Sequence, residues 1–304
     1  IIRCITSRTG DLKVKGYIDR SELHKVHGVS LEHFDIGERL NIKNEIEIIN
    51  KLTGKNSDFI GLEDPDIWID EETNLMHVYF TIPIRPGDKN KKTQIHLGHA
   101  VGKNLYSLEM TMPVLMDTGD MSAKEVSIAP KNSKGFRYNL IESRDRQIDT
   151  TYSIVKVAIA KDMGQPWKYG DTVFHPQDHN ISWIAGHASP GPLLPETFLD
   201  LGTGKRLGVI NGREANQKIG AEIKYGIFSV GLFVYDYENG KIDWVSPEPF
   251  IRDSEAKIIT FASQFLETGK GEGVLYAHVD DSFVRAYTLK AELLKSILPA
   301  KFIL

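Results

Sequence analysis

Residues 61–81 read GLEDPDIWIDEETNLMHVYFT, in which an acidic cluster precedes two short apolar runs. The cluster consists of Glu63, Asp64 and Asp66, set around Pro65. Proline has no N–H to donate to a sheet and is tolerated at the first residue of a strand, at an edge or at a bulge. Pro65 therefore indicates that a strand begins here and that the acids crowd one of its ends. Like charges this close repel one another, so we look for a function that keeps them together.

The two apolar runs predict a β-hairpin. Residues 66–69 and 75–81 are rich in strand-forming side chains, and the acidic turn 70–74 separates them. From these residues alone, a solvated acidic loop before a hairpin is the simplest interpretation.

The composition is that of an ordinary globular protein. The chain has 304 residues, of which 41% are hydrophobic and 26% charged, with a net charge of −4. This length suits one large domain or two small ones. The mildly negative charge gives no reason to expect a nucleic acid or an anionic membrane as a partner. No apolar run approaches the ~20 residues of a transmembrane helix, so we expect no membrane association.

Cys4 is the only cysteine, which excludes an internal disulfide, a redox pair and a cysteine-based zinc site. His175 and His179 have a metal-like spacing, but their proline-containing loop does not fix helical geometry, and we predict neither a metal nor a cofactor. The chain begins at Ile1 without a signal pattern, so a processed or trimmed form stays open, and we expect a cytoplasmic location.

Internal repetition gives the strongest indication of the fold. A strand with small residues, a polar turn and then an aromatic or apolar residue occurs five times, roughly 55 to 75 residues apart. This spacing is close to the repeat lengths of propeller blades and leaves room for about four strands in each unit. The copies occupy residues 23–34, 95–110, 154–169, 228–245 and 283–294.

Strand patterns dominate elsewhere too. Apolar runs of strand length occupy 154–160, 207–210 and 227–235, and only 289–297 has apolar residues at helical spacing. We therefore predict an all-β fold, a five-bladed β-propeller with a short C-terminal helix, as a single domain over residues 1–304. Coincidental similarity among the hairpins of a β-sandwich is the alternative.

A propeller would bring the starts of its innermost strands together around a central pocket. Glu63 and Asp64 would come from the second blade. The third blade would begin at 124–130, and its next strand, 136–141, would run directly into Glu142. The fourth and fifth blades would contribute the polar segments 186–190, 211–214 and 277–281.

In this order the segments resemble glycoside hydrolase family 130, five-bladed propeller enzymes that act on β-mannosides. LEDPDIW at 62–68 is similar to the family's E-D-P-R segment, and KEVSIAPKNSKGFRYNLIESRD at 124–145 is similar to its third-blade segment. AGHASPGPLL at 185–194 looks like its Gly-Ala-Pro-Pro turn, and WVSPEPFI at 244–251 looks like its Ser-Pro-Glu-Pro segment. LYAHVDDSFVRAYTL at 275–289 resembles its closing pair of strands.

The resemblance implies that Asp64 is the catalytic acid, which protonates the leaving oxygen through a hydroxyl of the bound mannose. The family's phosphorylases use inorganic phosphate as the nucleophile and hold it with cationic side chains. Its hydrolases lack that phosphate site and are thought to activate water with a glutamate.

Two departures from the family pattern favour water over phosphate. Asp66 stands where the family has arginine, and Glu142-Ser143-Arg144 replaces its His-Arg. Acids in place of cations disfavour a phosphate dianion, because unit charges ~4 Å apart interact by several kcal/mol at an effective dielectric of about 20. We therefore predict Glu142 as the general base of an inverting hydrolase, with its carboxyl about 6.5 to 9.5 Å from that of Asp64.

Other side chains are predicted to bind the glycoside or oligosaccharide substrate. They are Glu63, Lys124, Arg144, His187, Glu214 and Asp280, with Glu214 as the rival base. Trp68 and Trp183 could stack on sugar rings, although Trp68, within a strand, suits the core. Association with further copies of the chain stays open.

Two other functions also stay open. A β-mannoside phosphorylase could hold phosphate with Arg144, Lys124 and Arg213. A non-catalytic propeller could bind glycans or proteins, since a fold does not determine a function. The clustered acids argue against simple binding, because sugar binding rarely needs several carboxylates together.

Overall fold

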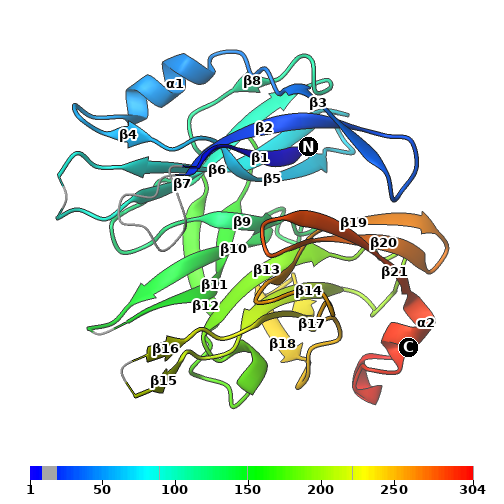
Figure 1. Cartoon of the computed structure of the whole chain (residues 1–304). Coiled ribbons are helices and arrows are strands. Elements are labelled where there is room, and N and C mark those ends of the chain that lie inside the picture. Colours follow the sequence, from blue (N-terminus) through cyan, green and yellow to red (C-terminus); the bar gives the residue numbers. More distant parts are fainter. Residues whose placement is uncertain (9–18, 89, 149, 221, 304) are drawn as a thin grey trace. The chain divides into compact units, whose positions relative to one another are not determined.

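The computed structural model describes residues 1–8, 19–88, 90–148, 150–220 and 222–303. In this part of the chain nearly all regular structure is antiparallel β-sheet (Figure 1). The residues form two compact units, Ile1–Glu125 with Asp162–Lys168, and Val126–Lys161 with Tyr169–Leu304. None of the described helices is long and apolar enough to cross a membrane.

The first two sheets belong to the first unit. In the first sheet, strands pair in the order β1–β2–β3, with bounds β1 (Ile2–Arg8), β2 (Asp19–Gly28) and β3 (Phe34–Arg39). The second sheet has the order β4–β6–β7–β8, and β5 also pairs with β6. Its strands are β4 (Asp58–Phe59), β5 (Glu63–Ile69), β6 (Met76–Arg85), β7 (Gln94–Gly102) and β8 (Glu109–Met110). Helix α1 (Glu45–Leu52) lies beside β8 (Figure 1).

Three more sheets follow in chain order. The third pairs β12–β11–β10–β9, with bounds β9 (Lys124–Ser127), β10 (Arg137–Arg146), β11 (Thr151–Ala160) and β12 (Lys168–Phe174). The fourth pairs β13–β14–β17–β18, with bounds β13 (His187–Leu193), β14 (Lys205–Arg213), β17 (Phe228–Asp236) and β18 (Lys241–Val245). The fifth pairs β19–β20–β21, with bounds β19 (Thr260–Gly269), β20 (Glu272–Val279) and β21 (Phe283–Lys290).

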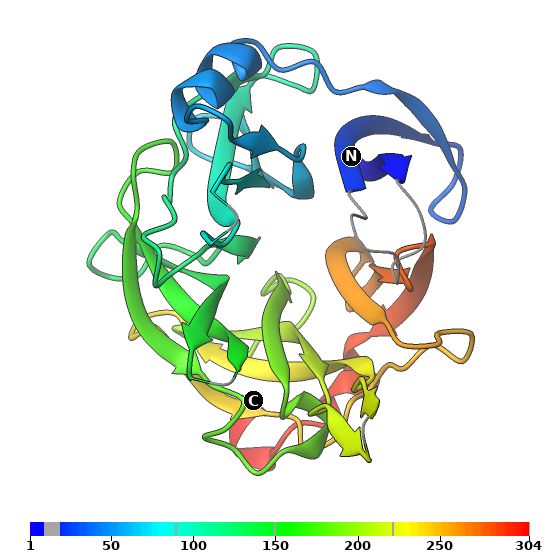
Figure 2. The same cartoon turned by 60° about the vertical axis from the view of Figure 1, so that its left-hand side comes forward.

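The remaining elements are short. A hairpin of β15 (Gln217–Ile219) and β16 (Glu222–Lys224) projects from the connection between β14 and β17, and its described residues are exposed (Figures 1 and 2). A 3₁₀ turn, Ser182–Ile184, precedes β13. At the C-terminal end β21 leads directly into α2 (Ala291–Lys295), which is followed by the turn Ala300–Phe302 (Figure 2).

Five successive antiparallel sheets confirm the predicted all-β, five-bladed β-propeller with a short C-terminal helix. The sequence repeats coincide with equivalent parts of the sheets. In each of the first four sheets the repeat covers the last long strand and the turn that leads to the outermost strand. These strand pairs are β2–β3, β7–β8, β11–β12 and β17–β18. The fifth repeat covers β21 and α2 instead, so a helix replaces the last strand of that sheet.

Each unit has its own apolar core. In the first unit, alternate residues of β6 such as Val78, Phe80 and Ile82 pack into a cluster that includes Leu23 and Ile48. In the second unit, two clusters lie among the strands, one containing Val209, Val230 and Leu275, the other Leu140, Trp183 and Tyr235. Burial of these side chains, at roughly 25 cal/mol per Å² of apolar surface, is the main force that holds the sheets together.

Helix α1 is absent from the sequence prediction, which finds helical spacing only at 289–297. The segment EIEIINKL contains three isoleucines, whose branched side chains are typical of strands. Only Ile48 and Ile49 are buried, while Ile46 is 78% exposed, so the apolar stripe of this helix is narrow. The predicted C-terminal helix is confirmed but covers only Ala291–Lys295.

Candidate active site

Asp64 lies in a β-bulge near the start of β5. The strand begins at Glu63, and its register against β6 shifts between Glu63 and Asp66. Pro65 occupies this bulge rather than the first position of the strand, which corrects the prediction. A bulge suits proline because the hydrogen-bond ladder is interrupted there and the missing N–H of proline is not needed. The bulge also turns the side chains of the inserted residues in a new direction.

The backbone of Asp64 has a left-handed conformation, with φ of 48°. This conformation is uncommon for residues other than glycine and costs about 1 to 2 kcal/mol per residue, although aspartate tolerates it better than most. Glu125, the second residue of β9, has the same φ of 48° and is not among the predicted site residues. Backbone strain of this kind is concentrated at functional sites, so the bulge marks Asp64 independently of its motif.

Arg3 joins the two acids of this bulge. Its guanidinium Nη2 lies 3.0 Å from Glu63 Oε1, and its Nη1 lies 3.8 Å from Asp64 Oδ1. Its Nε donates to Ser21 Oγ at 2.9 Å, and the Ser21 hydroxyl donates in turn to Glu63 Oε1 at 3.0 Å. Glu63 is therefore fixed by two partners, while Asp64 has the looser contact with Arg3. Through Arg3, which contacts both acids, Glu63 can help to orient Asp64.

Burial and the neighbouring charges shift the pKa of Glu63 in different directions. Burial raises the pKa of Glu63, the positive charge of Arg3 acts in the opposite direction, and the neighbouring Asp64 raises that pKa further. Lys124 also lowers the pKa of Glu63, so it lies within electrostatic range of this carboxyl. Asp64 and Lys124 thus both act electrostatically on Glu63, and the roles predicted for these residues stay predictions. Burial also raises the pKa of Asp66, to about 7.

Glu142 lies inside β10 and not after it. The predicted strand 136–141 extends to Arg146 because residues 139–143 are buried without interruption, including polar side chains that a hydrophobicity pattern does not count as strand interior. The Glu142 side chain is only 3% exposed. Arg144, two residues along the same strand, is on the same face of the sheet as Glu142.

His187 faces the buried carboxylate of Glu142. Its Nε2 lies 3.3 Å from Glu142 Oε2, and its side chain is 15% exposed. His187 is the first residue of β13, not part of a turn as predicted, and its ring meets the ring of Phe228 edge-on, with centroids 4.9 Å apart. The second unit therefore contains a buried carboxylate–imidazole pair that combines two predicted site residues.

Several solved structures share the fold over nearly the whole chain. The β-1,2-mannobiose phosphorylase from Listeria innocua, in complex with β-1,2-mannobiose, matches with a TM-score of 0.65 at 14% identity, covering 94% of this chain and 72% of that one. A predicted glycosidase from Bacteroides thetaiotaomicron matches with a TM-score of 0.62 at 17% identity, covering 93% and 80%. MPT-4, a mannose phosphorylase from Leishmania mexicana in complex with a phosphate ion, matches with a TM-score of 0.53 at 14% identity, covering 95% and 80%.

The chain has the fold of the propeller glycosidases and phosphorylases. The resemblance drawn from the sequence motifs is thus confirmed at the level of the fold. No protein-family model matches the sequence, and no curated protein matches it. The similarity is therefore carried by the arrangement of strands, with sequence identities of only 14% and 17% in the structures named above.

Glu214, the predicted rival base, follows the end of β14 and has one partner in its own loop and another in the loop after β18. Its Oε1 pairs with Arg252 Nη2 at 3.0 Å, and its Oε2 accepts the backbone N–H of Ile227 at 3.3 Å. Arg252 also donates to Ser229 Oγ at 2.9 Å. These contacts tie two loops together, and they make Glu214 less suited than Glu142 to act as a base.

Asp280 follows β20 and accepts three backbone hydrogen bonds. The N–H groups of Lys257, Ile258 and Ile259 reach its two oxygens at 2.7, 2.9 and 2.8 Å. Burial raises its pKa, but the three N–H donors and the charge of Lys257 outweigh burial, so the net shift is downward. Asp280 therefore fixes the loop before β19, and its predicted contact with the substrate stays a prediction.

The aromatic and metal candidates have structural partners. Trp183 is buried in the core and donates from Nε1 to the Ser246 carbonyl at 3.1 Å. His175 Nε2 lies 3.3 Å from Asp145 Oδ2, whereas His179 stacks on Phe174 with ring centroids 4.5 Å apart. Among the described residues no group of three or more histidine, cysteine or acidic side chains is placed to hold a metal ion.

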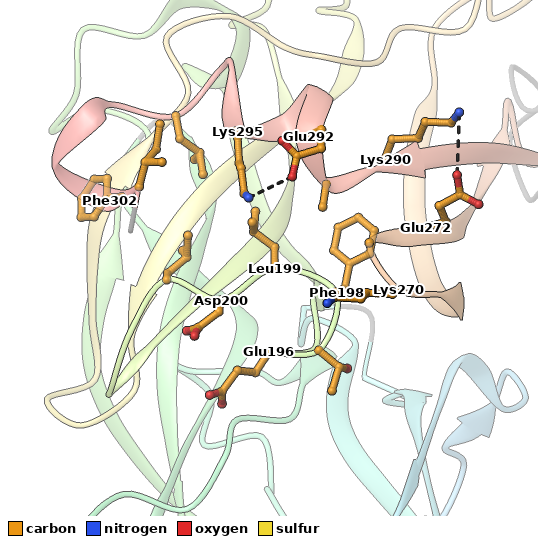
Figure 3. A pocket seen from close by; sticks show the side chains of 16 residues that line it. Glu196, Phe198, Leu199, Asp200, Lys270, Glu272, Lys290, Glu292, Lys295 and Phe302 are labelled. Carbon is orange, nitrogen blue, oxygen red and sulfur yellow. Dashed lines mark hydrogen bonds and ion pairs between the residues drawn. The ribbon is translucent and has the colours of Figure 1, made fainter.

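A cavity of about 630 Å³ lies beside the C-terminal helix (Figure 3). Two of its lysines face acids of the same rim: Lys295 lies 3.0 Å from Glu292, and Lys290 lies 3.8 Å from Glu272. None of the predicted site residues is among the described residues that line it. We therefore do not assign the reaction to this cavity.

Three residues of the site could not be identified from sequence patterns. Ser21, Phe228 and Arg252 contact predicted site residues, yet each belongs to an ordinary strand or loop segment. Arg3 contacts Glu63 and Asp64, and no local motif surrounds it either.

Proposed function

We propose that the protein hydrolyses β-mannosides or similar exo-linked glycosides with inversion at the anomeric carbon. The observation that carries this proposal is Asp64 in its left-handed bulge beside Glu63 and Arg3, at the position where the resembling E-D-P segment has its catalytic acid. The fold shared with a β-1,2-mannobiose phosphorylase and a mannose phosphorylase supports the class of substrate.

Asp64 is the general acid in this proposal. Arg3 lies closer to Glu63 than to Asp64, 3.0 Å against 3.8 Å, so its positive charge mainly compensates Glu63. Asp64 can then carry a proton to the leaving oxygen, while Glu63 and Arg3 hold it in place. Proton transfer from a positioned side chain typically contributes 10² to 10⁴-fold to the rate, about 3 to 5 kcal/mol.

Glu142 is the general base that takes a proton from the attacking water. An inverting glycosidase needs such a second carboxylate, ionised while the acid is protonated. Burial fixes the position of the Glu142 side chain, and His187 supplies a partner for its charge. Lys124, Arg144 and His187 are proposed to bind the sugar hydroxyls or to support these two carboxyls.

The local charges support water as the nucleophile. Asp66 and Glu142 occupy positions where the resembling phosphorylases have cations, so two of the positive charges that hold a phosphate dianion there are missing from these positions. Arg213, a candidate phosphate ligand, donates to the Gly186 carbonyl at 3.3 Å and lies 5.7 Å from the Phe228 ring centroid. It would have to leave these partners to bind an anion.

A product assay tests the proposal. The protein is incubated with β-1,2-mannobiose, β-1,4-mannobiose and an aryl β-mannoside, each with and without inorganic phosphate, and NMR follows the products. We expect mannose at the same rate in both conditions, released first as the α-anomer. Release of mannose 1-phosphate only when phosphate is present would overturn hydrolysis, and release of the β-anomer first would overturn inversion.

A phosphorylase is the second candidate, favoured by the fold shared with two phosphorylases, one of them in complex with phosphate. The same product assay separates it from the hydrolase.

A non-catalytic glycan-binding propeller is distinguished by Asp64→Asn. An enzyme would lose turnover by orders of magnitude, whereas a binding protein would show no turnover before the substitution and keep its glycan affinity after it.

A further inference from the structure

We propose that His187 is a positioning residue for Glu142, with a proton on Nε2 directed at Glu142 Oε2 so that the carboxylate stays ionised and fixed in orientation. This inference rests on the proposed function, in which Glu142 is the base. In that reaction water transfers one proton to Glu142 as its oxygen bonds to the anomeric carbon. The bond to the leaving oxygen breaks, and Asp64 supplies that oxygen with a proton.

The first argument is the burial of Glu142. Its side chain is 3% exposed and lies in a continuously buried stretch of β10, residues 139–143. An ionised carboxylate in such surroundings costs several kcal/mol unless a donor or a positive charge compensates it. His187 is one such partner, reaching Glu142 from another strand with Nε2 at 3.3 Å from Oε2.

The second argument is the fixed orientation of the imidazole. His187, Arg213 and Phe228 are in register across β13, β14 and β17, so they form one row at the same end of the sheet. The Phe228 ring meets the His187 ring edge-on, at an interplanar angle of 70°. Arg213 in turn lies over the Phe228 ring, with its guanidinium carbon 5.7 Å from the centroid. Packing of this kind restricts rotation of the imidazole ring, whose Nε2 lies 3.3 Å from Glu142 Oε2.

The third argument is the accessibility of the imidazole nitrogen. His187 Nε2 is buried, and the whole side chain is only 15% exposed. A residue whose function is to bind a sugar hydroxyl directly would present its polar atom to the substrate. The geometry therefore favours an action through Glu142 over the direct sugar contact predicted for His187 from the sequence. Two cationic side chains lie on neighbouring positions of the sheets: Arg144 is two residues from Glu142 in β10, and Arg213 of β14 is paired in register with His187.

The chain offers a matched control. His175 and Asp145 form a second histidine–carboxylate pair, with the same 3.3 Å separation between Nε2 and Oδ2. The His175 side chain is 11% exposed, close to the 15% of His187. Replacing His175 therefore removes a contact of the same length, although to a more exposed carboxylate (42% against 3%), from a residue that has no place in the proposed reaction.

Kinetics of three variants test the inference. We expect His187→Ala to lower kcat by about 10² or more, within the range of acid–base effects, and to change KM less than about threefold. His187→Gln keeps an N–H donor near the position of Nε2 and should recover most of kcat. His175→Ala should match the wild type. A raised KM with an unchanged kcat in His187→Ala would show direct sugar binding and overturn the inference, as would a failure of His187→Gln to recover kcat while it folds normally.

A second measurement does not depend on turnover. Long-range ¹H–¹⁵N NMR correlations of the wild-type protein report which nitrogens of His187 carry protons. We expect a proton on Nε2, and in Glu142→Leu a shift of the neutral ring toward the other tautomer. An unprotonated Nε2 in the wild type overturns this inference alone, even if hydrolysis is confirmed. A protonated Nε2 in a protein without turnover instead overturns the proposed function and reduces the pair to a structural contact.

Discussion

Ser21 donates its hydroxyl hydrogen to Glu63 Oε1 across 3.0 Å, and this bond joins the first sheet to the bulge of the second. The same residue accepts a bond from Arg3 and donates its backbone N–H to the Ile60 carbonyl at 3.2 Å. Ser21 therefore fixes the start of β5 through both its side chain and its backbone. The position of the neighbouring Asp64 depends on this attachment as well as on its own motif.

Asp64→Asn should abolish turnover without unfolding the protein. The amide cannot donate the proton of a carboxylic acid, so kcat should fall by about 10² to 10⁴. Asparagine also tolerates a left-handed backbone, so the melting temperature should stay within a few degrees of the wild type. Glycoside hydrolysis and thermal unfolding are measured together, and Asp88→Asn, on an exposed turn, serves as the control. Full activity of Asp64→Asn would contradict the assignment of the acid.

Gly61→Ala should destabilise the chain strongly. Gly61 has a φ of 141°, and a Cβ there would lie 2.0 Å from the Ser21 carbonyl oxygen. The clash and the backbone strain should together lower the free energy of unfolding by more than about 2 kcal/mol. Gly269→Ala is the matched control, because a Cβ at Gly269 meets no atom within 4 Å. Equal stability of the two variants in urea unfolding would show that the β2–β5 junction is not a tight contact.

Acid should destabilise the protein through a buried histidine pair. His99 Nε2 lies 2.9 Å from His77 Nδ1, and its Nδ1 lies 2.9 Å from Thr111 Oγ1. Burial, and then the neighbouring His77, lower the pKa of His99 to about 3, and burial lowers that of His77 as well. Unfolded histidines bind protons near pH 6.5, so below that pH the unfolded state binds more protons than the folded one.

The contribution of His99 to stability should therefore be lost progressively as the pH falls from about 6.5 toward 3. The loss can reach about 1.4 kcal/mol for each pH unit. Urea unfolding of the wild type and of His99→Gln at several pH values isolates this term. As the pH falls, the free energy of unfolding of the wild type should decrease more than that of His99→Gln. A difference that does not change with pH would mean that His99 titrates normally.

Asp66→Asn should show the opposite dependence on pH. Burial raises the pKa of Asp66 from 3.8 to about 7, so the folded state holds this proton more tightly than the unfolded state does. Its contribution to stability is complete below about pH 4 and is lost as the pH rises to about 7. At about pH 8 the variant should exceed the wild type in free energy of unfolding by about 1 to 3 kcal/mol, and this gain should disappear near pH 4.

Asp280→Asn separates a structural from a binding role. The amide has one acceptor oxygen in place of two, so at least one of the three loop N–H groups loses its partner. We expect a loss of about 1 to 3 kcal/mol in stability, with Asp88→Asn as the control for a single exposed turn bond. A stable variant with a raised KM would instead support the predicted contact of Asp280 with the substrate.

Local sequence patterns were sufficient to predict the five sheets, and they indicated the acid that we propose. Strand alternation, turns and repeat spacing are local properties, so β5, β6 and the repeated strand pairs follow from residues close in the chain. The E-D-P segment is equally local, and it indicated Asp64 and Glu63. Helix α1 was not predicted, because its β-branched residues are typical of strands. It also buries only two side chains, so its apolar spacing is weak.

The contacts that fix Glu63 and Glu142 form only in the folded protein. Ser21 and Glu63 are 42 residues apart in the chain, and Arg3 and His187 are similarly remote from Glu63 and Glu142. Such contacts leave no pattern in the sequence, because hydrogen bonds and charge pairs depend on distance in space. The strand that buries Glu142 also extends further than its apolar residues indicate, since its backbone pairs with β11 over its whole length, Arg137–Arg146.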